Sequence, residues 1–173
     1  MPEEHRRPLD VPRLLTVLCD AEVAFVIVGG MAAVAQGSAY LTVDLDICYQ
    51  RTSDNHQRIS DALKPLNPRL RGAPAGLPFV LDLPTLNAGL NFTFITDAGD
   101  IDLLGEVTGL GFYDQVMKQA EEVEIYDRRL WVLTIEGLIH AKQAAGRAKD
   151  LRLIPELQAL QALRKESDKK EEL

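Results

Sequence analysis

The chain has 173 residues, a formal net charge of −7 and a pI near 5.0, and 46% of its residues are hydrophobic. This length fits one ordinary domain, or one domain with a small helical appendage, and the hydrophobic fraction is typical of globular proteins. The acidic balance argues against a broad nucleic-acid-binding surface, which usually needs a basic face.

The chain carries no segment that predicts a membrane span or an export signal. No apolar run approaches the roughly 20 residues that span a bilayer. The opening MPEEHRRPLD lacks the apolar middle of a signal peptide. Cys19 and Cys48 show no metal-ligand spacing, so we expect reduced thiols that pack in the core. These features favour a cytoplasmic protein without membrane partners.

The first elements predict a helix, a strand and a second helix. Residues 11–23 show helical spacing of leucines, with Asp10 as the N-cap. Residues 24–30, AFVIVGG, form a short apolar run that ends in two glycines, and residues 31–37 follow as a short Ala-rich helix. The expected order is strand, tight turn and helix.

Residues 37–49, GSAYLTVDLDICY, predict a β-strand with two carboxylates on one face. Because strand side chains alternate with period 2, Asp44 and Asp46 project together. The opposite, apolar face belongs to a core and comprises Leu41, Val43, Leu45, Ile47 and Tyr49. Two like charges at about 4 to 6 Å repel by a few kcal/mol at an effective dielectric of roughly 20. A bound cation is the simplest group that offsets this repulsion.

The middle of the chain predicts a helix and a long loop. Residues 53–66 have helical spacing, and Pro65 should end or kink the helix. Residues 67–89 are rich in Pro and Gly, and a loop of this length is usually functional or mobile. Arg69 and Arg71 lie within this loop.

A hairpin with a second pair of carboxylates follows. Residues 90–96 and 100–107 flank Asp97–Gly99, in which glycine can take the positive φ of a tight turn. Asp100 and Asp102 share one face of the second arm. They add a third and a fourth carboxylate on a second strand, of which Asp100 is better explained as a hairpin or outer-shell residue.

The C-terminal part predicts mostly helices. Residues 112–123 favour a helix, residues 123–134 a strand or hairpin, and residues 135–163 two helices with a break near Gly146. The charged tail 164–173 is expected to fray.

Three carboxylates on neighbouring strands would make an oxygen-rich site of the kind that Mg²⁺ prefers, with Mn²⁺ as a substitute. Asp44, Asp46 and Asp102 would suit phosphoryl transfer with two metal ions, in which the protein supplies carboxylates and a phosphate cradle. Gly29 and Gly30 allow backbone N–H groups at the start of a helix to approach a triphosphate.

These motifs carry a resemblance to a known superfamily. VGGMAAVAQGSAYLTVDLDI and GDIDLLG resemble the nucleotidyltransferases with a DNA polymerase β-type palm. GSAYLTVDLDI and LIHAKQAAGRAKD are similar to the small bacterial proteins of the minimal and AbiE type. The resemblance covers roughly residues 11–160. It implies an α+β fold: a mixed β-sheet flanked by helices in a palm-like domain at 11–133, and a small C-terminal helical extension at 134–173.

The resemblance also implies an activity. A nucleoside monophosphate would pass from an NTP to an unknown acceptor, which could be RNA, a protein or a small molecule. Asp44, Asp46 and Asp102 would be catalytic and hold Mg²⁺, with Asp102 also acting as general base. A toxin-antitoxin or phage-defence role, with a protein partner, is a further implication.

The implied nucleotide-binding residues are Gly29, Gly30, Thr42, Lys142 and Arg147. From the residues themselves, Lys142 and Arg147 are also explained, with Lys149 and Arg152, as a solvated helical face that pairs with nearby acids. Asp150 would then be a structural partner of a basic residue. Trp131 favours a position in a core or an interface.

One departure from the family pattern leaves alternatives open. Tyr40 stands where relatives often have Arg, four residues before the first acid; Lys142, Arg69 or Arg71 are candidates to compensate. A catalytically weak or inactive nucleotide-binding or partner-binding protein, antitoxin-like, is therefore the main alternative. A metal-dependent phosphohydrolase or nuclease that uses the same acids is a third interpretation.

Overall fold

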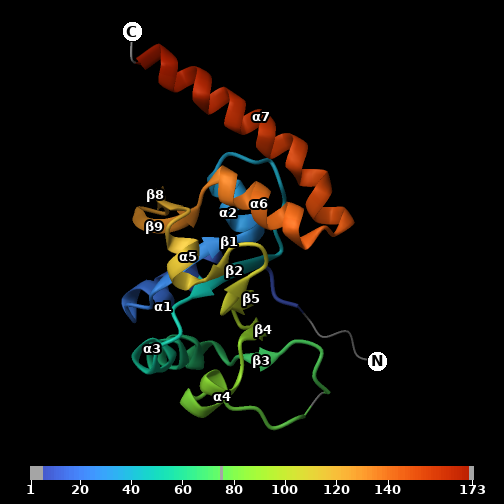
Figure 1. Cartoon of the computed structure of the whole chain (residues 1–173). Coiled ribbons are helices and arrows are strands. Elements are labelled where there is room, and N and C mark those ends of the chain that lie inside the picture. The colour runs from blue at the N-terminus through green and yellow to red at the C-terminus, as the bar shows by residue number, and fades with distance from the viewer. Residues whose placement is uncertain (1–5, 75, 172–173) are drawn as a thin grey trace.

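The structure, a computed structural model, describes residues 6–74 and 76–171. A mixed seven-stranded sheet with the order β3-β4-β5-β2-β1-β9-β8 runs through the molecule (Figure 1). Its strands are β1 (Phe25–Val28), β2 (Asp44–Tyr49), β3 (Arg69–Leu70), β4 (Asn91–Thr96), β5 (Gly99–Leu104), β8 (Ala120–Ile125) and β9 (Arg128–Leu133). A separate two-stranded ribbon consists of β6 (Glu106–Val107) and β7 (Gly111–Phe112).

Seven α-helices and one short 3₁₀ turn surround the sheet within the described residues. They are α1 (Val11–Asp20), α2 (Gly29–Ala35), α3 (Ser53–Leu63), the turn η1 (Lys64–Leu66), α4 (Leu83–Ala88), α5 (Tyr113–Met117), α6 (Ile135–Ala145) and α7 (Ala148–Glu171). Figure 1 shows α6 and α7 together on one side of the molecule, with α3 and α4 at the opposite end. The expected α+β class, with a mixed sheet flanked by helices and a C-terminal helical part, is confirmed. The division into domains at 11–133 and 134–173 stays a prediction.

The central strand β2 is shorter than the sequence pattern predicts. Leu45, Ile47 and Tyr49 are fully buried, as expected, but Leu41 and Val43 are 88% and 70% exposed. The prediction that these two belong to the core is wrong, because the strand begins only at Asp44. A buried free thiol, Cys48, lies on the same strand.

The prediction of a helix over residues 112–123 is largely wrong. Only Tyr113–Met117 is helical, and from Ala120 the chain forms β8, which pairs antiparallel with β9. Cross-strand pairing therefore overrides the helix propensity of the Gln, Lys and Glu residues here. Trp131, on β9, is 40% exposed, so a position in the core is wrong, and the alternative position in an interface stays a prediction.

The loop and the tail are more ordered than expected. Residues 67–89 contain the short strand β3 and the helix α4. The tail that was expected to fray continues α7 to Glu171. Within it, Arg164 Nη1 lies 2.9 Å from Glu121 Oε1 on β8, and its Nη2 donates to Gln36 Oε1. These contacts tie the C-terminal half of α7 to β8 and to the end of α2.

Asn55, on α3, forms hydrogen bonds with the residue directly before β1 and with the residue directly after β2. Its side chain is buried, accepts a hydrogen bond from Ala24 N at 2.7 Å, and donates to the carbonyls of Ala24 at 3.0 Å and Gln50 at 2.8 Å.

Asn55→Ala is expected to lower the free energy of unfolding in urea by about 2 to 4 kcal/mol, because buried backbone groups lose their partners. The exposed neighbour Gln57→Ala should change it by less than about 0.5 kcal/mol. Equal urea midpoints for the two variants would contradict this role.

Candidate active site

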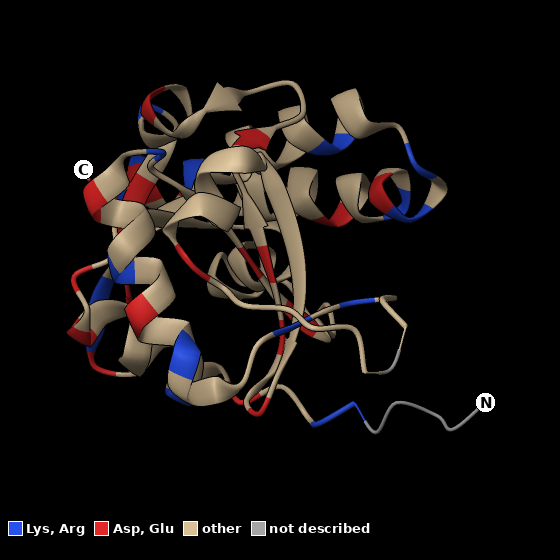
Figure 2. Ribbon diagram, turned by 90° about the horizontal axis from the view of Figure 1, so that it is seen from below, with Lys and Arg blue, Asp and Glu red and all other residues tan. Residues whose placement is uncertain are grey.

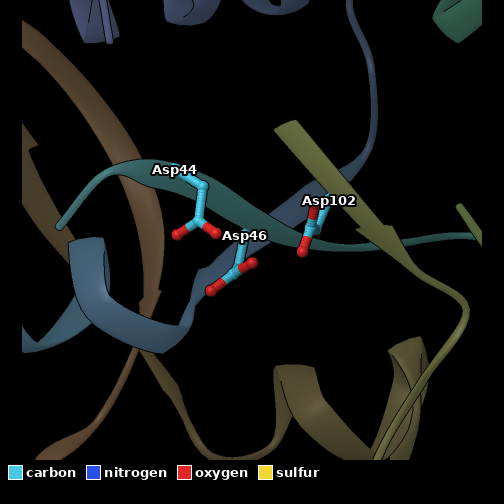
Figure 3. Close-up of side chains that lie close together, drawn as sticks. All are labelled: Asp44, Asp46 and Asp102. Carbon is cyan, nitrogen blue, oxygen red and sulfur yellow. The ribbon is translucent and has the colours of Figure 1, made fainter. Parts of the chain in front are cut away.

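Three carboxylates meet at one place on the sheet. β2 and β5 are parallel neighbours, and their register sets Asp44 beside Asp100 and Asp46 beside Asp102. One carboxylate oxygen each from Asp44, Asp46 and Asp102 lies within 4.8 Å of the other two. Figure 3 shows the three carboxylates directed into one space beside the strands. We call these three residues the carboxylate triad.

The negative charge of the carboxylate triad is unfavourable unless a cation neutralises it. Burial and the negative charges of Asp44 and Asp102 raise the pKa of Asp46 to about 7. Burial also raises the pKa of Asp102, although the Arg71 guanidinium acts in the opposite direction. Carboxyl groups that resist ionisation because like charges crowd them are the groups that a divalent cation stabilises.

The two glycines at the start of α2 pack directly against this acidic segment. Gly29 has φ +63°, and a Cβ there would lie 2.1 Å from Asp46 Oδ2. A Cβ on Gly30 would lie 2.8 Å from Thr42 Oγ1 and 2.9 Å from Tyr40 Cε1. The glycines are therefore needed for the close approach of α2 to the acidic segment. The sequence alone indicates only that they let a triphosphate approach the backbone, so this packing requirement is an additional role.

A pocket of about 500 Å³ opens over the triad and brings together most of the residues expected from the sequence. Its charged lining comprises five carboxylates and three cations: Asp44, Asp46, Asp102, Glu106, Asp150, Lys142, Arg147 and Lys149. Gly29, Gly30, Tyr40 and Thr42 line it as well. Figure 2 shows acidic positions on the central strands and basic positions mainly on the helices and loops around them.

Two of the three basic residues of the pocket share one acidic partner. Lys142 Nζ lies 3.5 Å from Asp150 Oδ1, and Arg147 Nε lies 2.6 Å from Asp150 Oδ2. Burial alone would raise the pKa of Asp150, but the hydrogen bond and charge of Arg147 and the charge of Lys142 hold it below its usual value. Asp150 thus fixes both cations at the mouth of the pocket, as a structural partner of basic residues.

The sequence interpretation gave two residues of the site a different role. Lys149, which was explained as part of a solvated helical face, lines the pocket, and its positive charge acts to lower the pKa of Asp46. Arg71, considered only as a compensating cation for phosphates, instead lies on Asp102, with Nη2 at 2.7 Å from Oδ1. The LIHAKQAAGRAKD motif contained the signal for Lys149, whereas nothing in the spacing of Arg71 pointed to Asp102. Arg69 lines a different pocket, together with Lys64 and Asp97.

No protein-family model matches the chain, and no curated protein matches it. A solved structure of a candidate nucleotidyltransferase from Thermotoga maritima is similar over 96% of this chain and 99% of that chain, with 17% sequence identity and a TM-score of 0.46. A match this distant concerns the course of the backbone alone, and the likeness to AbiE-type proteins stays a prediction. Within residues 6–74 and 76–171, none of the helices combines the length and the apolar character that crossing a membrane requires.

Proposed function

We propose that this protein is a Mg²⁺-dependent nucleotidyltransferase that transfers a nucleoside monophosphate from an NTP to an acceptor hydroxyl. The observation that carries the proposal is the carboxylate triad, held by adjacent parallel strands beside the Gly29–Gly30 turn in a pocket with a basic wall. The resemblance of these same segments to nucleotidyltransferase motifs supports it.

The residues of the pocket fit divalent cations. Its five carboxylates outnumber its three cations, and burial together with the charges of Asp44 and Asp102 raises the pKa of Asp46 although Lys149 acts in the opposite direction. A triphosphate would add further negative charge to this pocket. Mg²⁺ binds through a few carboxylates and substrate phosphates, which is the donor set available here. Asp44, Asp46 and Asp102 would hold one or two such ions, and Mn²⁺ would serve in place of Mg²⁺.

The chain's own residues account for the transfer as follows. Lys142, Arg147 and Lys149 line the same pocket as the acids and would bind the phosphates. The acceptor oxygen forms a bond to the α-phosphorus, the bond from that phosphorus to the bridging oxygen breaks, and pyrophosphate leaves. Asp102 would accept the acceptor's proton as a general base. A bound divalent cation would neutralise the phosphates and acidify the attacking hydroxyl.

The acceptor and the partners of this reaction are further parts of the proposal. RNA, a protein hydroxyl and a small molecule remain the candidate acceptors. The resemblance to AbiE-type proteins supports a toxin-antitoxin or phage-defence setting with a protein partner.

Thermal unfolding with Mg²⁺ and each of the four NTPs tests the proposal. One NTP is expected to raise the midpoint of the wild type only when Mg²⁺ is present, since a ligand at 100 times its Kd adds about 2.7 kcal/mol. The double variant Asp44→Asn, Asp46→Asn should keep its fold and show no shift. Transfer is then followed with the NTP labelled on its α-phosphate.

The outcomes separate the three interpretations of the site. If no NTP stabilises the wild type, the nucleotidyltransferase proposal is wrong. If the protein binds Mg²⁺ and an NTP but labels no component of a cell extract offered as acceptor, the nucleotide-binding alternative is favoured. Tyr40, in place of the Arg of the family pattern, motivates this alternative. Phosphodiester or phosphomonoester cleavage without added NTP would favour the hydrolase.

A further inference from the structure

Arg71 bridges two carboxylates of β5 from the edge of the sheet. It directly follows β3, and its backbone N donates to the carbonyl of Thr93 on β4 at 2.9 Å. Its Nη2 donates to Asp102 Oδ1 at 2.7 Å, and its Nε lies 3.3 Å from Asp100 Oδ2. One planar guanidinium therefore contacts both carboxylates on this face of β5, a geometry that a lysine ammonium cannot reproduce.

Asp100 provides the anchor for this arginine. Its side chain is only 5% exposed, and Asp100 Oδ1 has no hydrogen-bond partner within the described part of the chain. A buried carboxylate without a cation is strongly destabilising, so Asp100 depends on its ionic partners. Arg6 Nε also lies 3.2 Å from Asp100 Oδ2, but its side chain is 59% exposed, against 22% for Arg71. Arg71 is accordingly the principal partner of Asp100.

The contact with Arg71 restricts the orientation of the Asp102 carboxylate, which lies on β5 while the other two acids of the triad lie on β2. A carboxylate has two oxygens, and an arginine that occupies one of them leaves the other available to a cation. Groups that hold a ligating carboxylate in one orientation reduce the cost of ordering it when the metal binds. Arg71 meets this requirement for Asp102 because it is itself fixed by Asp100 and by the backbone of β4.

Resting on the proposed function, we propose that Arg71 is a positioning residue that, anchored on Asp100, holds the Asp102 carboxylate in the orientation that completes the triad. The edge segment between α3 and β4 thereby contributes to the site through β3, although it supplies no ligand itself. Arg71 supports the cation and does not compete with it.

Mn²⁺ binding without nucleotide, measured by electron paramagnetic resonance of the free ion, tests this role. Arg71→Gln is expected to raise the Kd for Mn²⁺ by about 10- to 100-fold, as for other residues that orient metal ligands. Arg71→Lys should give an intermediate Kd, because an ammonium keeps the charge but loses the two-carboxylate bridge. Arg69→Gln, at an exposed arginine two residues earlier on β3, is the matched control and should bind as the wild type does.

A second variant separates positioning from folding. Arg71→Gln leaves Asp100 buried without its principal cation, and this alone can destabilise the fold. The double variant Arg71→Gln, Asp100→Asn removes that unpaired charge, so we expect it to have a midpoint of thermal unfolding near that of the wild type. It should still bind Mn²⁺ at least 10-fold more weakly. A folded double variant with the wild-type Kd would overturn the inference.

The inference and the proposed function fail in different ways. If the wild type binds Mn²⁺ and Arg71→Gln binds it equally or more tightly, Arg71 is a competitor or a bystander, and the proposed function is untouched. If the wild type itself binds no Mn²⁺, the metal-dependent function is wrong, and the positioning role is overturned with it.

Discussion

Gly29→Ala is expected to abolish the stabilisation by Mg²⁺ and NTP and to lower the free energy of unfolding by about 2 to 4 kcal/mol. Two effects combine at this position. Gly29 has φ +63°, which an L-residue adopts only at a cost. In addition, the new Cβ would lie 2.1 Å from Asp46 Oδ2, so the carboxylate must move out of the triad. Urea unfolding and the nucleotide-dependent thermal shift measure the two losses separately.

Gly76→Ala is the matched control for this prediction. Gly76 has φ +83°, and a Cβ there would have no neighbour within 4 Å. This variant therefore bears the cost of the backbone conformation without the collision. We expect it to lose about 1 to 2 kcal/mol and to keep the full response to Mg²⁺ and NTP. If Gly29→Ala retained that response, the close contact with Asp46 would have no part in the site.

Asp46→Asn is expected to stabilise the metal-free protein at pH 8 by about 2 to 4 kcal/mol. The folded-state pKa of Asp46 is about 7, above the ordinary value of 3.8 that applies to the unfolded chain. Between these two values the unfolded chain has lost the proton while the folded chain retains it. Wild-type stability therefore falls as pH rises, by up to about 1.4 kcal/mol per pH unit from this group, and the loss is complete above pH 7.

The measurement is urea unfolding in EDTA at pH 4.5 and pH 8 for the wild type and two variants. The stability difference between Asp46→Asn and wild type should be small at pH 4.5 and large at pH 8. Asp168→Asn, at an exposed position on α7, should show no such difference. Saturating Mn²⁺ at pH 8 should stabilise the wild type and leave Asp46→Asn nearly unchanged. A difference that does not depend on pH would show that the ionisation of Asp46 is not its source.

The sequence predicted the acids well because their placement follows from local rules. The alternation of side chains along β2 and β5 decides that Asp44 shares a face with Asp46, and Asp100 with Asp102. The glycine pair at the start of α2 is likewise recognised from neighbouring residues in the sequence alone. Leu41 and Val43 show where the rule ends, since alternation carries information only while the chain stays in the sheet.

The parts that the sequence did not predict depend on contacts between distant segments. Arg71 reaches Asp102 only because β3 pairs with β4, and a two-residue strand has no periodicity to detect. The helix expected over 112–123 failed because the register of β8 with β9 outweighs the propensity of single residues. Arg147 and Asp150 are three residues apart, a spacing that the sequence shows. Lys142 lies on α6 and reaches Asp150 on α7 only because the two helices pack together, which the sequence does not show.

The parallel pairing of β2 with β5 has a consequence for experiments on the isolated chain. The third acid of the carboxylate triad lies on β5, far along the sequence from β2. The complete set of three acids therefore exists only when these two strands are paired. An unfolded chain offers single carboxylates, which bind divalent cations weakly. Cation binding should therefore shift the denaturant midpoint and leave the slope of the transition unchanged. A titration with Mn²⁺ thus counts native molecules, and it can serve as an assay of correct folding before any substrate is known.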